Sequence, residues 1–383
     1  MRTSGRRDGY DVVVVGAGIV GLASAWMARR RGLSVAVVER DPRCMGASIR
    51  NFGFVTVTGQ RAGKTWSRAL RSRDLWAELA PQAGIPVVHQ GLWVLAQRQA
   101  AWEVLEAFSK TSMGEDCELC SPAQIATRAP FLRARDSQGA LYSPHELRVE
   151  SRVAIGQLAG WLAGSCGVEF FFDHEAVGIS ASGVELTASG GQIDLAAERV
   201  VLAPGTHLNG LAKPFLSAYS LGLTQLQMLR VRPRQSYRQT SAVMSDLSLV
   251  RYAGYTGLAE HRRLLSQLEA ECPASLADGI HLIVVQSQDG SLVVGDSHHN
   301  SRQVDPFGQD AVDQRILAHM SEAIELSDYE VVDRWLGWYP VGGPDDALVV
   351  APEPWLRVIS VTSGTGASTA FGLAEEVFDQ WSS

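Results

Sequence analysis

The residues whose spacing most clearly suggests chemistry are three glycines near the amino terminus, Gly16, Gly18 and Gly21. They follow the β-branched run 12–15 and match G-x-G-x-x-G. In this pattern the first glycine permits a tight turn, the second lets the backbone approach a pyrophosphate, and the third lets a helix pack on the strand. The next expected strand ends at Glu39, where a carboxylate can bind ribose hydroxyls. The pattern predicts a dinucleotide site without choosing between NAD and FAD.

Three further segments favour FAD as the dinucleotide. Small residues and backbone amides in the loop over 45–53 could lie beside a diphosphate and a flavin ring, and a buried strand over 198–205 ends in a turn. A strand over 356–361 leads through the glycine-rich stretch 362–369 into a helix over 367–381. The positive end of that helix could stabilise negative charge on the pyrimidine side of a reduced flavin.

The residues expected to contact FAD stand at these strand-to-helix junctions. A helix over 19–31 would direct its first N–H groups at phosphate, and Gly32 is placed to end it. The full set is Gly16, Gly18, Ile19, Val20, Gly21, Glu39, Arg40, Ala47, Ser48, Arg50, Asn51, Ala203, Gly205, Gly364, Gly366, Ala367, Ser368 and Thr369.

Taken together, these motifs resemble those of the D-amino-acid-oxidase-like flavoproteins, the group that includes glycine oxidase and sarcosine oxidase. The resemblance covers nearly the whole chain and is carried by 12–21, 47–53, 200–205 and 364–366. It implies hydride transfer from the carbon beside a substrate nitrogen to flavin N5, followed by hydrolysis of the imine. The electron acceptor would be O2 or another acceptor. No histidine or cysteine stands where the family attaches its flavin covalently, so non-covalent FAD is expected.

A narrower resemblance points to a bacterial subgroup linked to aminophosphonate metabolism. It is carried by 47–53, 226–230, 279–282 and 294–298. The chain departs from that subgroup at Ala367, where a methionine is expected. The resemblance implies a small amine or amino acid substrate that carries a carboxylate or a phosphonate.

Arginine suits the anchoring of such an acidic group, because its planar fork can bind two oxygens at once. Arg230 and Arg232 alternate on an expected strand and share one face, which either covers the flavin, as the resemblance implies, or is a solvated edge. Arg50 and Asn51 stand in the loop expected near the flavin ring, where they either act on the substrate or close the loop. Arg251 could line the same pocket.

Aromatic residues could keep the pocket dry, which would favour the neutral amine that oxidation requires. The candidates are Tyr252, Trp335 and Tyr339. Each of them could instead belong to the hydrophobic core.

Two clusters that could suggest a metal have simpler explanations. His298 and His299 are neighbours, which on a strand point to opposite faces, and no third ligand is evident beside Asp296. Cys117 and Cys120 form a C-x-x-C pair without a second pair. No metal is therefore expected.

The composition excludes several classes of protein. The chain has 383 residues, 46% of them apolar and 20% charged, which fits a globular protein rather than a disordered one. A net charge of -7 argues against a general nucleic-acid binder, and glycines interrupt the uncharged run 12–28, which argues against a membrane anchor. Five scattered cysteines give no disulfide framework, so a cytoplasmic location is expected. The expected assembly is a monomer or a homodimer.

These elements predict an α/β fold in which a discontinuous, Rossmann-like FAD-binding domain is joined to an α+β substrate domain with a mostly antiparallel sheet. The FAD-binding domain is expected over 8–90, 145–215 and 340–383, and the substrate domain over 91–144 and 216–339. Further helices are expected over 62–80, 100–109, 150–164 and 310–324. Further strands are expected over 91–96, 168–172, 183–187, 192–196, 224–232, 282–286, 292–295 and 329–335.

Three alternatives stay open on the sequence alone. The same fold also handles C–OH bonds, so the protein could be a 2-hydroxy-acid oxidoreductase. It could be a tailoring oxidase that acts on a hydrazine or an N-hydroxylated amine. A flavin-binding regulatory protein without turnover is the alternative outside enzymes.

Overall fold

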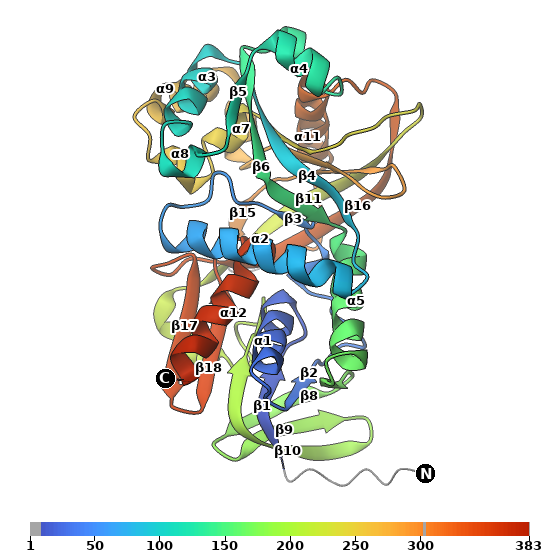
Figure 1. The fold of residues 1–383 in the computed structure, drawn as a ribbon, viewed down its shortest axis with the longest axis vertical. Helices are drawn as coiled ribbons and strands as arrows, with labels where there is room; N and C mark the ends of the chain where they lie inside the picture. The colour runs from blue at the N-terminus through green and yellow to red at the C-terminus, as the bar shows by residue number, and fades with distance from the viewer. Residues whose placement is uncertain (1–8, 302–303, 383) are drawn as a thin grey trace.

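Two β-sheets stacked along the long axis, with helices packed against them, make up the computed structural model of this protein (Figure 1). It describes residues 9–301 and 304–382. No helix in these ranges is both long enough and apolar enough to cross a membrane.

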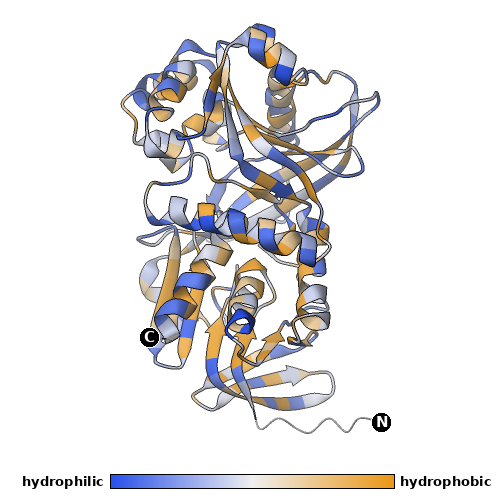
Figure 2. Cartoon of the chain, viewed as in Figure 1, coloured by the Kyte–Doolittle hydropathy of each residue, from blue (hydrophilic) through white to orange (hydrophobic). Residues whose placement is uncertain are grey.

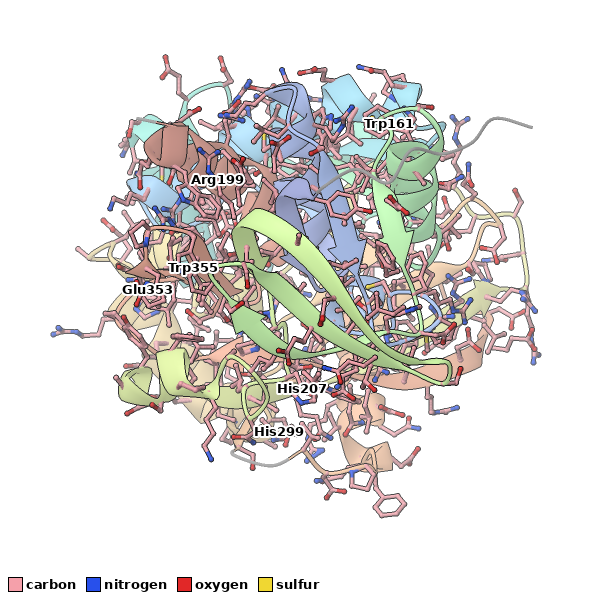
Figure 3. The ribbon with its side chains drawn as sticks, turned by 90° about the horizontal axis from the view of Figure 1, so that it is seen from below. Trp161, Arg199, His207, His299, Glu353 and Trp355 are labelled. Carbon is pink, nitrogen blue, oxygen red and sulfur yellow. The ribbon has the colours of Figure 1, made fainter. Side chains whose placement is uncertain are left out.

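The lower sheet in Figure 1 contains both glycine junctions. Its eight strands are β1 Tyr10–Val15, β2 Val35–Val38, β7 Glu169–Phe171, β8 Glu175–Ser180, β9 Gly183–Ala188, β10 Gly191–Leu202, β17 Ala347–Glu353 and β18 Leu356–Val361. They stand in the order β17-β18-β10-β1-β2-β7, parallel except for β17 at the edge, and β8 and β9 extend β10 as an antiparallel hairpin. Figure 3 views this sheet from below, with Arg199 and Trp355 to one side and Trp161 of helix α5 (Ser151–Gly164) to the other.

The valine run explains why β1 lies in the middle of this sheet. Val12 and Val14 are fully buried against helices on one face, and Val13 is fully buried on the other. A strand buried on both faces requires such a continuous apolar run, and the central strands are accordingly orange in Figure 2. The helices that pack on the first face are α1 Ile19–Arg30, α2 Lys64–Gln82, α5 and α12 Gly366–Ser382.

The upper sheet is the predicted second sheet. Its ten strands are β3 Phe54–Val55, β4 Val87–Ala96, β5 Glu118–Cys120, β6 Gly139–Val149, β11 Gly222–Pro233, β12 Ala242–Met244, β13 Ile283–Gln286, β14 Leu292–Gly295, β15 His299–Ser301 and β16 Tyr329–Val341. Their order is β15-β11-β14-β13-β12-β4-β6-β3, with β16 on β11 and β5 on β6, and β12 with β4 is the one parallel pair among the described strands of this sheet. The remaining described α-helices are α3 Gln99–Phe108, α4 Pro122–Arg128, α6 Lys213–Leu216, α7 Asp246–Leu249, α8 Ala253–Thr256, α9 His261–Glu271, α10 Pro273–Ala277 and α11 Asp310–Ala323.

The predicted α/β fold with a mostly antiparallel second sheet is confirmed, but two strands were divided or ended too early. Segment 192–196 and the first five residues of segment 198–205 share the single strand β10, because its first half pairs with β9 and its second half with β1. Strand β16 continues to Val341 instead of ending at 335, because it pairs with β11 along its whole length. The domain boundaries stay a prediction.

Candidate active site

The turn after β1 has room only for glycine. At Gly16 φ is +104°, and a Cβ there would lie 2.4 Å from the carbonyl oxygen of Ala203. A Cβ on Gly21 would lie 1.8 Å from the carbonyl oxygen of Gly16, so the third glycine lets α1 pack on the turn. A Cβ on Gly18 would fill the space beside the Ser48 hydroxyl, 3.2 Å away. The turn is thus a cradle in which a backbone can approach a pyrophosphate.

Glu39 stands beside this turn. Its carboxylate accepts hydrogen bonds from the backbone N–H groups of Ala17, at 2.9 Å, and Asp41, at 3.2 Å. Burial raises the pKa of Glu39, and these hydrogen bonds oppose the rise. Arg40, which was also expected to contact FAD, directs its guanidinium at the ring of His207. That Glu39 also binds ribose hydroxyls stays a prediction.

The loop after β2 closes over the start of α1. Its short 3-10 helix Ala47–Ile49 brings the Ser48 hydroxyl to 2.9 Å from the N–H of Ile19, which donates a hydrogen bond to it. The side chain of Asn51 donates to two carbonyl oxygens of the loop and accepts from the N–H of Gly53. Of the two roles considered for Asn51, loop closure explains all of these hydrogen bonds.

The second glycine junction, between β18 and α12, faces the first. Gly364 has a φ of +75°, and a Cβ there would lie 2.7 Å from the ring of Tyr339. A Cβ on Gly366 would lie 3.6 Å from the side chain of Ile19, so the start of α12 lies beside the start of α1. The two helix N-termini therefore border one site, although their junctions are more than 300 residues apart in the chain.

A cavity of about 600 Å³, called the first cavity below, lies between the two junctions. The FAD candidates that line it are Gly18, Ile19, Val20, Gly21, Ala47, Ser48, Arg50, Asn51, Ala203, Gly205, Gly364, Gly366, Ala367 and Ser368. Gly16, Glu39 and Arg40 are not among its lining residues, nor is Thr369, whose hydroxyl donates to the carbonyl oxygen of Thr365 just before α12. Because glycine backbone borders this cavity from both sides, the residues present fit FAD.

Three further substrate candidates line the same cavity beside Arg50 and Asn51: Arg251, Tyr252 and Tyr339. Burial raises the pKa of both tyrosines, so their hydroxyls stay protonated. Arg251 donates to the Tyr339 hydroxyl at 3.4 Å and, within the described residues, has no carboxylate at ion-pair distance. Arg61, another arginine of the cavity, is already paired with Asp346 at 2.9 Å. Arg251 is therefore free to meet an acidic group.

Arg230 does not line this cavity. Its guanidinium lies 2.8 Å from the Glu150 carboxylate and 3.5 Å from that of Asp289, so two carboxylates offset its charge. Arg232 is exposed and faces Glu330. The positions of these two arginines do not support the anchoring role that their alternation on a strand suggested.

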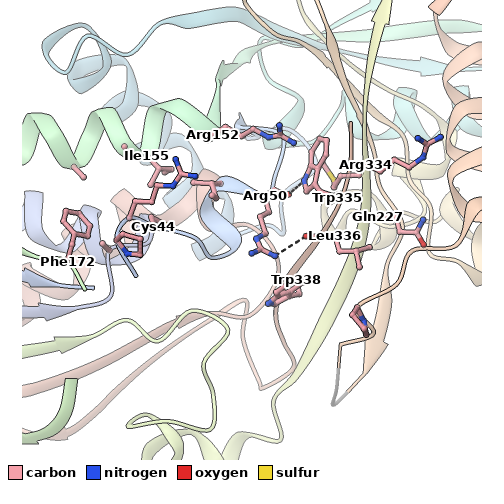
Figure 4. A pocket seen from close by; sticks show the side chains of 18 of the residues that line it. Cys44, Arg50, Arg152, Ile155, Phe172, Gln227, Arg334, Trp335, Leu336 and Trp338 are labelled. Carbon is pink, nitrogen blue, oxygen red and sulfur yellow. Dashed lines mark hydrogen bonds between the residues drawn. The ribbon is translucent and has the colours of Figure 1, made fainter. Parts of the chain in front are cut away.

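Figure 4 shows a second cavity, of about 1300 Å³. It adjoins the first across Arg50 and Trp338, which line both. The Arg50 guanidinium lies 4.3 Å from the centre of the Trp338 ring, and its Nε donates to the carbonyl oxygen of Met45 at 3.0 Å. Trp335 lines the second cavity, and its indole N–H donates to the carbonyl oxygen of Arg50. Trp335 therefore borders the second cavity and not the first.

A cluster of three side chains that the sequence did not bring together also lines the first cavity: His281, Asp296 and His298. Nε2 of His281 lies 3.1 Å from Oδ1 of Asp296, and Nε2 of His298 lies 3.7 Å from Oδ2. His281 and Asp296 meet because they exchange two backbone hydrogen bonds at the open end of the β13–β14 hairpin. The Asp-Gly turn at 289–290 is the sequence signal that could have placed them opposite each other.

Burial sets the charges in this cluster. It lowers the pKa of both imidazoles, which are therefore neutral near pH 7, and it raises the pKa of Asp296 to about 7. The positive charge of Arg251 acts in the lowering direction on all three groups. That charge also opposes the binding of a metal cation here, so the absence of a metal stays our prediction.

Comparison with known proteins identifies one family in sequence and several similar structures. The family model described as FAD dependent oxidoreductase matches residues 11–380. A solved structure of glycine oxidase from Bacillus cereus superposes with a TM-score of 0.76 at 18% identity, covering 97% of this chain and 95% of that one. L-proline dehydrogenase from P. horikoshii superposes with a TM-score of 0.75 at 17% identity, covering 96% and 92%. These two likenesses concern the fold.

Two curated relatives are similar in sequence. N-methyl-L-tryptophan oxidase from Salmonella arizonae is 26% identical over 208 residues, which are 53% of this chain and 55% of that protein. Glycine oxidase from Geobacillus kaustophilus is 29% identical over 210 residues, which are 51% of this chain and 54% of that protein. The chain thus matches about half the length of each relative.

Proposed function

Because the chain belongs to the family of FAD-dependent oxidoreductases, we propose that it oxidises a C–N bond in a small amine or amino acid that carries a carboxylate or a phosphonate. FAD, held without a covalent bond between the two glycine junctions, would supply the hydride acceptor. The imine product would then hydrolyse in water. The names of both curated relatives, oxidases of a glycine and of an N-methylated amino acid, support an amino acid as the substrate class.

On this proposal the residues of the chain bind the cofactor and orient the substrate. The starts of α1 and α12 direct backbone N–H groups and the positive ends of two helices at the cofactor side of the first cavity. Glu39 binds the ribose hydroxyls. The aromatic rings of Tyr252 and Tyr339 displace water from the opposite wall, which favours a neutral amine over an ammonium ion.

Arg251 carries the proposal. It lines the first cavity, and within the described residues no carboxylate lies at ion-pair distance from its guanidinium. A substrate carboxylate or phosphonate that enters the cavity could accept two parallel hydrogen bonds from the guanidinium. Such a bidentate ion pair is stronger than a single neutral hydrogen bond. The amine end of such a substrate would then lie against the remaining cavity wall.

An anaerobic titration of the FAD-loaded protein tests the reaction. The panel consists of glycine, N-methylglycine, N-methyl-L-tryptophan and 2-aminoethylphosphonate, with glycolate and lactate as the C–OH counterparts. We expect at least one acidic amine to bleach the visible absorption of the flavin. Bleaching by the hydroxy acids alone, or by none of the compounds, contradicts the proposal. Reduction by 2-aminoethylphosphonate in preference to glycine would support the aminophosphonate resemblance.

The variant Arg251→Gln tests the anchor. Loss of a charge pair with the acidic group should weaken apparent substrate binding by about 2–5 kcal/mol, which raises KM on the order of 30-fold or more. Arg232→Gln, an exposed arginine outside the cavity, is the matched control and should leave KM unchanged. Equal KM values for the Arg251→Gln variant and the unmodified protein would remove Arg251 as the anchor.

A further inference from the structure

We propose that Asp296 is the proton acceptor that converts a bound substrate ammonium ion into the neutral amine, an inference that rests on the proposed function. Amines with an acidic group arrive at neutral pH as ammonium ions. An ammonium nitrogen has no lone pair, so oxidation of its C–N bond requires that a proton leave first. The first cavity contains one arrangement that fits this task.

One carboxylate oxygen of Asp296 accepts no hydrogen bond from a described residue. Its side chain lines the first cavity and is only 4% exposed. Oδ1 receives no hydrogen bond from any described residue, because the 3.1 Å contact with Nε2 of His281 lacks hydrogen-bond geometry. A buried carboxylate oxygen without a donor costs free energy. The N–H of a substrate ammonium ion would supply the missing donor.

The two histidines do not compete for this proton. Nδ1 of His298 donates to the carbonyl oxygen of Gly279 at 3.0 Å, so that imidazole already has its one proton as a neutral ring. The rings of His281 and His298 stack with their centres 4.9 Å apart, and burial keeps the pKa of both well below the ordinary value. Two neutral rings therefore flank the carboxylate and leave it as the acceptor.

The groups that face Asp296 leave its carboxyl group partly ionised near pH 7. They are the two neutral imidazoles, the protonated hydroxyls of Tyr252 and Tyr339, and the guanidinium of Arg251. Burial raises the pKa of Asp296 and the Arg251 charge limits the rise, with a resulting pKa of about 7. An acceptor with a pKa near the working pH exists as the carboxylate often enough to receive a proton and still holds that proton well.

The step moves one proton and no electrons. An N–H bond of the ammonium ion breaks, its electron pair stays on nitrogen as the lone pair, and an O–H bond forms on Asp296. The positive charge of the ammonium ion and the negative charge of the carboxylate disappear together, which suits a buried site. The carboxylic acid later loses its proton to water, and no co-reactant is needed.

The unmodified protein alone can test the proposal. The rate of anaerobic flavin reduction is measured against pH with N-methylglycine and N-(2,2,2-trifluoroethyl)glycine, or with the corresponding pair built on whichever amine reduces the flavin. The fluorinated amine is much less basic. If Asp296 takes the proton, kcat/KM for N-methylglycine rises with pH through a value near 7, whereas the fluorinated amine, which is already neutral at pH 7 and needs no proton acceptor, shows no rise there. A rise for N-methylglycine that instead continues to the pKa of its free amine overturns the proposal.

The variant Asp296→Asn gives the second measurement. We expect its rise near pH 7 to disappear and to be replaced by a rise at the pKa of the free amine. For an amine of pKa about 10 this lowers kcat/KM at pH 7 on the order of 1000-fold, because only the neutral fraction reacts. Asp246→Asn is the matched control: Asp246 is equally buried and has a raised pKa of about 6, but it pairs with Arg98 outside the cavity. Its pH profile should equal that of the unmodified protein.

The possible results separate the two proposals. If no amine reduces the flavin, the proposed function fails. If an amine reduces the flavin but its pH profile follows amine basicity, or Asp296→Asn keeps the rise near 7, the role of Asp296 fails and the proposed function stands. If the variant does not bind FAD, the comparison of the two substrates on the unmodified protein decides.

Discussion

Replacing Gly21 with alanine measures how strictly the turn after β1 requires glycine. In an unconstrained helix interior alanine is favoured over glycine by about 1 kcal/mol. Here the new Cβ would lie 1.8 Å from the carbonyl oxygen of Gly16, more than 1 Å inside the closest distance that such contacts reach. The opposing atom belongs to the backbone and cannot rotate away. Because overpacking of this kind costs about 1–3 kcal/mol, we expect a net destabilisation of up to about 2 kcal/mol.

The same substitution should weaken FAD binding, because either the turn or α1 must move to admit the methyl group. A displacement that costs about 1.4 kcal/mol in the complex reduces affinity tenfold. Urea unfolding of the FAD-free protein and titration of FAD fluorescence measure the two effects. Gly156→Ala on α5 is the matched control, since a Cβ there meets no atom within 4 Å and should stabilise by about 1 kcal/mol. If Gly21→Ala is as stable as Gly156→Ala and binds FAD normally, the steric reasoning is refuted.

Two further predictions concern Glu39 and His89. Glu39→Ala removes the acceptor for two backbone N–H groups and the ribose ligand, so FAD affinity measured by fluorescence should fall at least tenfold; unchanged affinity would place the ribose elsewhere. His89 is buried, and burial together with the Arg148 charge lowers its pKa to about 3, so the unfolded chain binds the proton first as pH falls. The stability that the neutral ring contributes is complete above pH 6.5 and is lost toward pH 3. Between pH 7 and 5 the unmodified protein should therefore lose about 2 kcal/mol more in urea unfolding than His89→Gln does, and equal losses would contradict the lowered pKa.

The parts of the fold that could be predicted from the sequence are those that depend on neighbouring residues. A valine run such as 12–15 must be buried on both faces wherever it lies in a sheet, and the glycines that follow it need their turn whatever packs around them. The same holds for Gly364, whose positive φ belongs to the junction before α12. These local requirements explain why both glycine junctions stand where the sequence places them.

The substrate side depended on the pairing of distant strands, which one sequence does not reveal. Arg230 was taken as an anchor because alternation predicts a shared face, but Glu150 from a segment 80 residues away pairs with it. Asp296 was considered with His298 and His299 only, because His281 reaches it through the hairpin register. Trp335 and Tyr339 were treated alike, although they border different cavities.

The place of β18 between β17 and β10 has a consequence for the nascent chain during its synthesis on the ribosome. Strand β10 is complete at Leu202, whereas its neighbour begins only at Leu356. At the usual pace of translation this interval lasts on the order of 10 to 30 s. During that time a row of backbone N–H and C=O groups on the nascent chain has no partner strand, and such an edge invites pairing with other chains. The ribosome-bound intermediate, rather than the finished protein, is therefore where chaperone protection would matter most.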